Sequence, residues 1–290
     1  DASLRRRPMD RVAAPLRRLG AGIDGDRVPM TIEGLHPAIP RTHRLEMPSA
    51  QVKSALLLAG LNTPGVTEVI EPTPTRDHLE RLLPLFGAEI AAEHASIRVR
   101  GEVELKPQQL AISRDPSAAA FLAVAALIVP GSEIRMDCIC VNPRRTGIFR
   151  ALEAAGADLA FDNEREASGE PVADVTVRHS ALAGIDVPPE LVTDMIDEFP
   201  IFFVSAAFAK GTTRARGLGE LRIKESDRIA TMAAGLRAIG ARVEETGDGL
   251  AIHGSGGAPL PGGASIDPRG DHRVAMSLAV AGLHAVQPIG

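Results

Sequence analysis

The feature that most constrains the fold is an internal repeat in which a helix ends in Gly-Ala and two short strands follow. The Gly-Ala pairs stand at residues 20–21, 87–88, 156–157 and 240–241. Glycine favours the left-handed conformation that ends a helix, so we predict outer helices just before each pair. Polar and apolar residues alternate in the segments that follow, as at residues 96–99, which predicts hairpins with one solvated face.

A second kind of helix is predicted between the hairpins. Its residues are small and apolar around nearly the whole circumference, so we expect it to be buried on all sides. These inner helices are predicted at residues 52–61, 117–129, 201–209 and 274–283. The repeated unit is then an inner helix, a strand, an outer helix and a hairpin. This order predicts an α/β fold built from repeats rather than one doubly wound sheet.

The length of 290 residues predicts about two domains. We place their boundary near residues 110–115, after a Lys-Pro-Gln-Gln stretch, and we predict that the Gly- and Pro-rich residues 254–270 form a surface loop. The chain does not begin with Met, and it ends where another strand should begin. We therefore expect a fragment that lacks sequence at both ends.

Composition excludes several classes of protein. The 32 Lys and Arg against 37 Asp and Glu, with no Trp or Tyr, argue against a nucleic-acid binder. Cys138 and Cys140 are too few for a zinc site and too close for an easy disulfide, which favours a reducing compartment. The apolar stretches fall short of the ~20 residues of a membrane span, and no signal-peptide pattern opens the chain. We expect a cytoplasmic protein without nucleic-acid or membrane partners.

Charged residues recur where the predicted helices begin. Lys224 and Arg228 are four apart, which would place both on one helix face beside Glu225. This pattern suits either a salt-bridged helix start or an anion clamp that contains a carboxylic acid. The pair Asp197-Glu198 precedes a buried helix, and a carboxylate there is either an N-terminal cap or a partly desolvated base. Residues 271–273, Asp-His-Arg, occupy the same place before the last inner helix.

If the helices are arranged alike, their N-terminal N–H groups and several cations converge on one cationic cleft. The cations concerned are Arg7, Arg76, Lys224, Arg228 and Arg273. Small substrates that carry phosphate and carboxylate groups would fit there, with Asp197 and Glu225 left for proton transfer. Each helix start, taken alone, is also consistent with an ordinary cap in solvent.

Two further patterns do not indicate a functional site. Residues 20–25 spell G-x-G-x-x-G, but a dinucleotide site needs a strand before this motif and a helix after it, and here a helix comes first. His272 has no second His or Cys at ligand spacing, so we do not expect it to bind a metal.

The most specific signature is LRIKESDR at residues 221–228, followed by DHRVAM at residues 271–276. Six more segments accompany it: DASLRRRPM (1–9), PSAQVKSALLLAGL (48–61), TRDHLERLL (75–83), DPSAAAFL (115–122), NPRRTG (142–147) and DEFPI (197–201). In this order they make the chain similar to the 5-enolpyruvylshikimate-3-phosphate synthase family over essentially its whole length.

The resemblance implies the two-globe inverse α/β barrel of the enolpyruvyl transferases, in which each globe has three repeated βαβαββ units. It also implies helix N-termini aimed at the cleft between the globes. We assign residues 1–112 to an N-terminal globe with two of its three units, and residues 113–290 to a C-terminal globe that lacks its last element. We expect a monomer.

The implied reaction transfers the carboxyvinyl group of phosphoenolpyruvate to the 5-hydroxyl of shikimate 3-phosphate and releases phosphate, without a metal or an organic cofactor. The implied catalytic residues are Asp197 as the base at the hydroxyl, Glu225 as the acid at the methylene, and Lys224. Shikimate 3-phosphate is implied to contact Ser49, Ala50, Gln51, Arg76, Asp197 and Lys224. Phosphoenolpyruvate is implied to contact Arg7 and Gln51 on its phosphate side, Arg228 and Arg273 at its carboxylate, and His272.

Two alternatives stay open. The sibling carboxyvinyltransferase that acts on UDP-N-acetylglucosamine relies on a loop cysteine, whereas Cys138 and Cys140 lie in an apolar, strand-like stretch. A non-catalytic fragment or homologue is the other alternative, because the family's N-terminal Lys-Ser-x-x-x-Arg motif and its late Lys are absent. Within the matched region the chain departs at Arg114, where Gly is commoner, and at Glu220, where some members have a substrate-contacting Asn.

Overall fold

The structure is a computed structural model that describes residue 5 and residues 8–290. It divides into two compact units. Unit 1 comprises Asp1–Ile112 with Ala167–Glu170, and unit 2 comprises Ser113–Glu166 with Pro171–Gly290. Each unit contains its own cluster of buried apolar side chains.

The predicted repeat is confirmed at the ends of the outer helices. The glycine that follows each of them has a left-handed backbone, with φ of +101°, +86°, +90° and +95° at Gly20, Gly87, Gly156 and Gly240. An L-residue with a side chain rarely adopts this conformation, so glycine both ends the helix and turns the chain into the next hairpin.

Each inner helix is bracketed by two segments that pair in parallel. In unit 1, Thr42 to Arg44 pair with Glu68 to Ile70 across one inner helix. In unit 2, three such pairings cross the other inner helices: Arg114 with Ile139, Asp186 with Arg214, and Leu260 to Gly262 with Ala285 to Gln287. The unit is therefore βαβαββ, as the resemblance implies.

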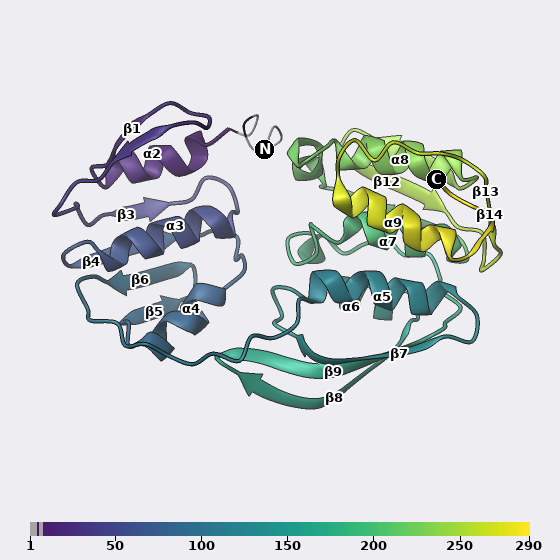
Figure 1. The fold of residues 1–290 in the computed structure, drawn as a ribbon, viewed down its shortest axis with the longest axis horizontal. Coiled ribbons are helices and arrows are strands. Elements are labelled where there is room, and N and C mark those ends of the chain that lie inside the picture. Colours follow the sequence, from purple (N-terminus) through teal and green to yellow (C-terminus); the bar gives the residue numbers. More distant parts are fainter. Residues whose placement is uncertain (1–4, 6–7) are drawn as a thin grey trace. The chain divides into compact units, whose positions relative to one another are not determined.

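In unit 1, helix α3 packs against a four-stranded sheet of order β3-β4-β6-β5, and α2 packs against α3 (Figure 1). Leu56 and Leu57 of α3 meet Val69 and Val99 of the sheet in the buried cluster. The elements are α2 (Asp10–Arg18), β1 (Gly22–Asp24), β2 (Thr31–Glu33), β3 (Thr42–Arg44), α3 (Ala50–Leu61), β4 (Val66–Ile70), α4 (His78–Leu82), a 3-10 helix (Leu83–Phe86), β5 (Ile90–Glu93) and β6 (Ser96–Arg100).

In unit 2, the inner helices α5, α7 and α9 pack against one another, and α8 packs on α7 and α9 (Figure 1). Three sheets surround them, of orders β7-β9-β8, β10-β12-β11 and β13-β14. The helices are α5 (Pro116–Ile128), α6 (Gly147–Ala154), α7 (Phe199–Phe208), α8 (Arg228–Ala238), α9 (His272–Gly282) and 3-10 helices at Pro189–Leu191 and Gly219–Ile223. The strands are β7 (Glu133–Cys140), β8 (Asp158–Ala167), β9 (Glu170–Arg178), β10 (Thr212–Ala215), β11 (Arg242–Thr246), β12 (Gly249–His253), β13 (Leu260–Gly262) and β14 (Ala285–Gln287).

The prediction of four fully buried inner helices is only half right. Every residue of α7 is buried, and so are most residues of α5. Helices α3 and α9 keep an exposed face, where Leu58 is 47% and Met276 is 42% exposed, because the described neighbours cover only part of their circumference. The predicted surface loop 254–270 is also partly wrong, since it contains β13. Among the described residues, no helix is both long and apolar enough to cross a membrane.

Candidate active site

The centre of the site in unit 2 is the guanidinium of Arg228, whose side chain is only 2% exposed. Its Nε donates to Asp271 Oδ2 at 2.9 Å, its Nη1 to Asp197 Oδ1 at 3.3 Å and its Nη2 to Glu225 Oε2 at 2.6 Å. A buried guanidinium is tolerated because charge-assisted hydrogen bonds replace its hydration. One cation therefore joins three carboxylates that come from three separate segments of the chain.

Helix caps position two of these segments. Asp271 is the N-cap of α9 and accepts a hydrogen bond from the backbone N of Arg273 at 3.0 Å. Asp227 is the N-cap of α8 and accepts from the backbone N of Ala230 at 3.0 Å. The capping alternative is wrong for Asp197, because the N-cap of α7 is the next residue, Glu198.

Asp271 also carries a shifted pKa. Complete burial raises the pKa of Asp271, but the hydrogen bond and the charge of Arg228 outweigh burial and lower it below its ordinary value. Further hydrogen bonds come from the backbone of Arg273 and from the hydroxyl of Ser226. Asp271 therefore stays ionised and holds Arg228 at the start of α8.

The prediction that Lys224 and Arg228 share a helix face is wrong. The 3-10 helix ends at Ile223 and α8 begins at Arg228, because Asp227 caps a new helix there. Both cations nevertheless lie near the same atom, Asp197 Oδ1, with Lys224 Nζ at 3.6 Å and Arg228 Nη1 at 3.3 Å. Lys224 Nζ also lies 2.6 Å from Glu220 Oε1, so Glu220 contributes an ion pair at this position.

Arg273 projects from the first turn of α9 toward the start of α7. Its Nη1 donates to the backbone O of Asp197 at 3.0 Å and lies 3.5 Å from Glu198 Oε1. Glu198 is 2% exposed and accepts a hydrogen bond from Ser117 Oγ at 2.5 Å. Burial raises the pKa of Glu198, against the opposing effects of Ser117 and Arg273. The sequence indicated the pair Asp197-Glu198 as a cap or a base, but only Asp197 was predicted as a site residue. Glu198 is the N-cap of α7, without a side-chain capping hydrogen bond.

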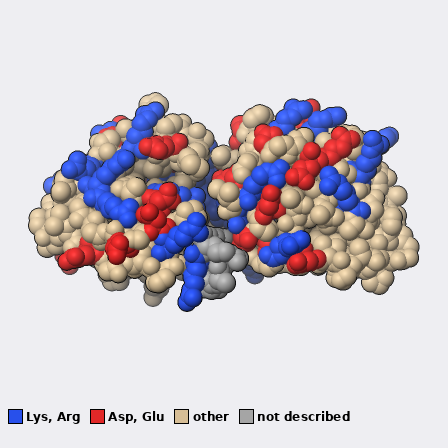
Figure 2. Space-filling view, turned by 90° about the horizontal axis from the view of Figure 1, so that it is seen from above, with Lys and Arg blue, Asp and Glu red and all other residues tan. Residues whose placement is uncertain are grey.

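In unit 2 the predicted cations do not stand alone. Its three predicted cations, Lys224, Arg228 and Arg273, each lie within 3.6 Å of a carboxylate or a carbonyl oxygen. Acidic and basic side chains are also interspersed on the face drawn in Figure 2. The physical reason is that cations taken out of water near helix N-termini need acidic partners.

Unit 1 holds the other predicted residues. Ser49 caps α3, since its Oγ accepts from the backbone N of Val52 at 3.3 Å. Ala50 and Gln51 begin the helix, with Gln51 exposed, and Arg76 is half-buried between β4 and α4. Sequence reasoning also missed Lys53, which is fully buried in the same helix, although a lysine in an otherwise apolar inner helix was a visible signal.

Arg7 and His272 complete the set of predicted residues. Arg7 lies outside the described residues. His272 is the exposed first residue of α9.

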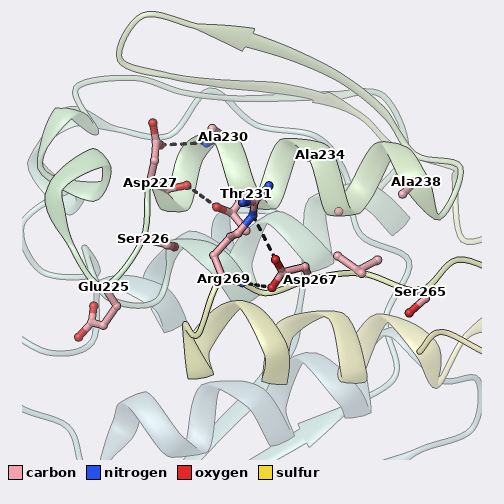
Figure 3. Close-up of a pocket in the computed structure, with 12 residues that line it drawn as sticks. Glu225, Ser226, Asp227, Ala230, Thr231, Ala234, Ala238, Ser265, Asp267 and Arg269 are labelled. Atoms are coloured by element: carbon pink, nitrogen blue, oxygen red, sulfur yellow. Dashed lines mark hydrogen bonds and ion pairs between the residues drawn. The ribbon is translucent and has the colours of Figure 1, made fainter. Parts of the chain in front are cut away.

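A hollow of about 640 Å³ lies beside α8 (Figure 3). The small side chains of Ala230, Ala234 and Ala238 line one side of it, and residues 265–269 line the other. Glu225 at its edge is the residue that it shares with the carboxylate cluster. Arg228, Asp197 and Asp271 do not line the hollow, so it lies next to this group of charges and does not contain it.

Comparisons with known proteins point to one family. A family model described as EPSP synthase (3-phosphoshikimate 1-carboxyvinyltransferase) matches residues 1–289. A protein named 3-phosphoshikimate 1-carboxyvinyltransferase from Sphingopyxis alaskensis is 55% identical over 301 residues, which cover 100% of this chain and 68% of that protein. One of the same name from Novosphingobium aromaticivorans is 56% identical, with 98% and 67% covered. The chain thus spans about two thirds of the length of these relatives.

Solved structures give the same result. EPSP synthase from Acinetobacter baumannii matches with a TM-score of 0.89 and 44% identity over 100% of this chain and 67% of that chain. The enolpyruvyl transferase NikO from Streptomyces tendae matches with a TM-score of 0.77 at 19% identity, over 99% of this chain and 66% of that chain, which shows a shared fold alone.

Proposed function

The chain belongs to the EPSP synthase family of 3-phosphoshikimate 1-carboxyvinyltransferases, and we propose that its residues transfer the carboxyvinyl group of phosphoenolpyruvate to the 5-hydroxyl of shikimate 3-phosphate. The observation that carries the proposal is the pair of carboxylates on Arg228. Asp197 and Glu225 come from different segments, yet one guanidinium contacts both, at 3.3 and 2.6 Å. The transfer needs a base at the hydroxyl and an acid at the methylene carbon, and the two must lie close together. Asp197 and Glu225 supply such a pair.

In the proposed mechanism Asp197 is the base and Glu225 is the acid. Asp197 takes the proton of the 5-hydroxyl while the hydroxyl oxygen forms a bond to C2 of phosphoenolpyruvate, and Glu225 gives a proton to C3. The C2–O bond to phosphate then breaks, with its electron pair going to the phosphate. C3 returns a proton to Glu225 as the double bond re-forms, and the hydroxyl proton leaves from Asp197 with the phosphate. Lys224 Nζ lies 3.6 Å from Asp197 Oδ1, beside the carboxylate that acts as the base.

We assign the carboxylate of phosphoenolpyruvate to Arg228 and Arg273. A guanidinium has five N–H donors, of which Arg228 uses three for its carboxylates. Its contact with Asp197 is the longest of the three, so this is the contact that an arriving carboxylate replaces. The exchange would release Asp197 toward the substrate hydroxyl at the moment when it is needed as a base. His272 lies beside Arg273 in sequence and is assigned to the same substrate.

Shikimate 3-phosphate is assigned to the start of α3 and to Arg76, together with Asp197 and Lys224. Ser49 and Ala50 stand where the unpaired N–H groups of α3 favour an anion, and Gln51 is exposed there. Arg76 supplies a planar fork that suits a phosphate better than a lysine does. Arg7, by motif, is assigned to phosphoenolpyruvate with Gln51. We further propose that the protein works as a monomer in the cytoplasm, a reducing compartment in which Cys138 and Cys140 would stay reduced.

The test is release of phosphate from phosphoenolpyruvate with shikimate 3-phosphate as acceptor, measured on the 290-residue chain and on a version extended to the length of its relatives. We expect release by the extended version. Glu225→Gln in that version should lower kcat by roughly 10²- to 10⁴-fold, with little change in the affinity for shikimate 3-phosphate. Glu244→Gln, at an exposed ion pair with His253 on β12, is the matched control and should leave kcat unchanged.

Three results would contradict the proposal. Absence of release by either version would make the non-catalytic alternative the correct one. A normal kcat for Glu225→Gln with a raised Kd for shikimate 3-phosphate would refute the proton role of Glu225. Release with UDP-N-acetylglucosamine as acceptor would identify the sibling reaction, which the placement of Cys138 and Cys140 within β7 disfavours.

A further inference from the structure

A buried lysine in unit 1 joins three elements around the residues assigned to shikimate 3-phosphate. Lys53 of α3 has a side chain that is 1% exposed, and its Nζ lies 2.8 Å from Glu71 Oε1 and 2.6 Å from Glu80 Oε1. Glu71 directly follows β4 and Glu80 belongs to α4. Both carboxylates are also almost fully covered, with 7% and 9% of their side chains exposed. We call these three residues the buried lysine cluster.

The cluster connects to both parts of the proposed phosphate site. On α3, the backbone N of Lys53 donates to the backbone O of Ser49 at 3.0 Å, one turn from the cap. On the other side, the second oxygen of Glu71 accepts from the backbone N of Thr75 at 3.2 Å and from its hydroxyl at 2.8 Å. Thr75 immediately precedes Arg76, so Glu71 holds the residue before the proposed phosphate ligand.

The residue after Arg76 is held as well. Asp77 accepts from Arg81 Nε at 2.9 Å, one turn into α4. The same helix carries Glu80, which binds Lys53. Hydrogen bonds therefore hold the residues on both sides of Arg76. Glu71 makes the bonds to Thr75, α4 makes the bond to Asp77, and both Glu71 and α4 contact Lys53.

Burial of one lysine with two carboxylates is unfavourable, and an apolar residue at position 53 would fit an inner helix with a smaller desolvation penalty. The desolvation penalty has an explanation if the three charges fix α3, β4 and α4 relative to one another more precisely than apolar packing would. Resting on the proposed function, we propose that the buried lysine cluster is a positioning device that fixes Arg76 relative to Ser49 and Gln51. In this way it sets the affinity for the phosphorylated acceptor.

The test is calorimetric titration of shikimate 3-phosphate into variants of the same chain. Thr75→Val removes the hydroxyl bond to Glu71 and leaves the cluster's charges in place. We expect it to weaken binding roughly three- to tenfold, the effect of one hydrogen bond. Thr75→Ser restores the hydroxyl and should restore the affinity. In Glu71→Gln the side chain has one acceptor oxygen in place of two, so it cannot accept from both Lys53 and Thr75. This variant should weaken binding of shikimate 3-phosphate at least as much as Thr75→Val does.

Thr63→Val is the matched control, because the hydroxyl of Thr63 donates to Ala59 O at 2.9 Å at the other end of α3. It loses a comparable hydrogen bond and should bind shikimate 3-phosphate within twofold of the unvaried chain. Hydrogen exchange supplies a readout that needs no ligand. Exchange at the amides of residues 75–77 should accelerate in Thr75→Val and stay unchanged in Thr63→Val.

The outcomes separate the two proposals. Binding by the unvaried chain with equal affinity in Thr75→Val and Thr63→Val would refute the positioning role and leave the proposed function standing. Unchanged exchange at the amides of residues 75–77 in Thr75→Val would also refute it. No binding of shikimate 3-phosphate by either the unvaried or the extended chain would refute the proposed function, and the positioning role with it.

Discussion

Glu198 is a carboxylic acid in an environment that opposes its charge. One oxygen accepts from Ser117 and lies near Arg273, and the other, Oε2, is buried without a hydrogen-bond partner among the described residues. Burial is the largest influence on the pKa of Glu198 and raises it. The folded state therefore binds a proton more tightly than the unfolded state, so stability is fully present below the unfolded pKa and is lost as pH rises through the folded pKa.

Glu198→Gln should remove this loss, because the amide keeps the size and the acceptor for Ser117 but does not ionise. We expect the stability of the variant relative to the unvaried chain to increase as pH rises from 4.5, by at most about 1.4 kcal/mol per pH unit. Urea unfolding of unit 2 at several pH values measures it. Glu198→Asp, which keeps an acid, is the control. Parallel stability curves for the Gln variant and the unvaried chain would contradict the argument.

For single residues, the sequence predicted which side chains form the site better than it predicted which side chains they contact. Asp197, Glu225 and Arg228 were singled out from the sequence, and the structure brings them together. Asp271, the third carboxylate on Arg228, could be predicted only as a cap, because it reaches Arg228 across 43 positions of the chain. Contacts of that range depend on how the inner helices pack, which no local pattern records.

Among the elements, three helices of unit 2, namely α5, α8 and α9, begin at aspartates. Asp115, Asp227 and Asp271 each accept a backbone N–H from the first turn of α5, α8 and α9. Such caps satisfy donors that otherwise have no partner in the helix. The cap of α8 matters most for the site, because the next residue is Arg228.

Asp227→Ala should destabilise unit 2 by about 1 to 2 kcal/mol, since it removes the cap of α8. Asp227→Asn keeps a good cap and removes only the ion pair with Arg222, which is 2.8 Å long and half-exposed, so it should cost less than about 1 kcal/mol. Denaturant unfolding of the two variants gives the comparison. Equal losses would show that the charge of Asp227, and not its capping hydrogen bond, is what α8 requires.

Element boundaries were largely predictable because their signals are local. The Gly-Ala pairs placed the ends of the outer helices correctly, since a left-handed glycine is encoded at one position. The prediction for residues 224–228 was wrong for a related reason. Ser226-Asp227 is itself a cap signal that starts α8 anew, but the spacing of Lys224 and Arg228 was given more weight.

For the whole molecule, two buried groups, Glu198 in unit 2 and His43 in unit 1, should make stability depend on pH in opposite directions. In unit 1, His43 is 2% exposed, and neither ring nitrogen has a hydrogen-bond partner among the described residues. Burial first, and then the charges of Arg18 and Arg41, lower the pKa of His43. The unfolded chain therefore binds the proton more tightly, and the contribution of neutral His43 to stability is lost as pH falls below about 6.5.

His43→Leu should protect unit 1 against acid. Hydrogen exchange of α3 and β4 at pH 5 and pH 8 measures the opening of that unit, while exchange of α7 reports on unit 2. We expect the variant to slow exchange in α3 at pH 5 relative to the unvaried chain and to have a smaller effect at pH 8. Slowing of the same size at both pH values would mean that the variant acts through apolar packing and not through the proton.

The overall architecture could be predicted from the sequence repeats, whereas the charges around the site could not. Repeats with a helix, a strand and a hairpin were visible along the chain, and the parallel pairing across each inner helix completes them. The acidic surroundings of Lys224 and Arg228 differ from the expected cationic cleft. Counting charges near helix starts cannot show which carboxylates fold back onto them.

The three carboxylates on Arg228 have a consequence for how ligands enter. A site whose cations already have counter-anions gains a substrate carboxylate by ion exchange, so the number of ion pairs stays nearly constant. Added salt weakens the outgoing pair as well as the incoming one, and the two effects largely cancel. Affinity for an anionic substrate should then decline only gently with ionic strength, which would let an acidic protein bind anions at physiological ionic strength.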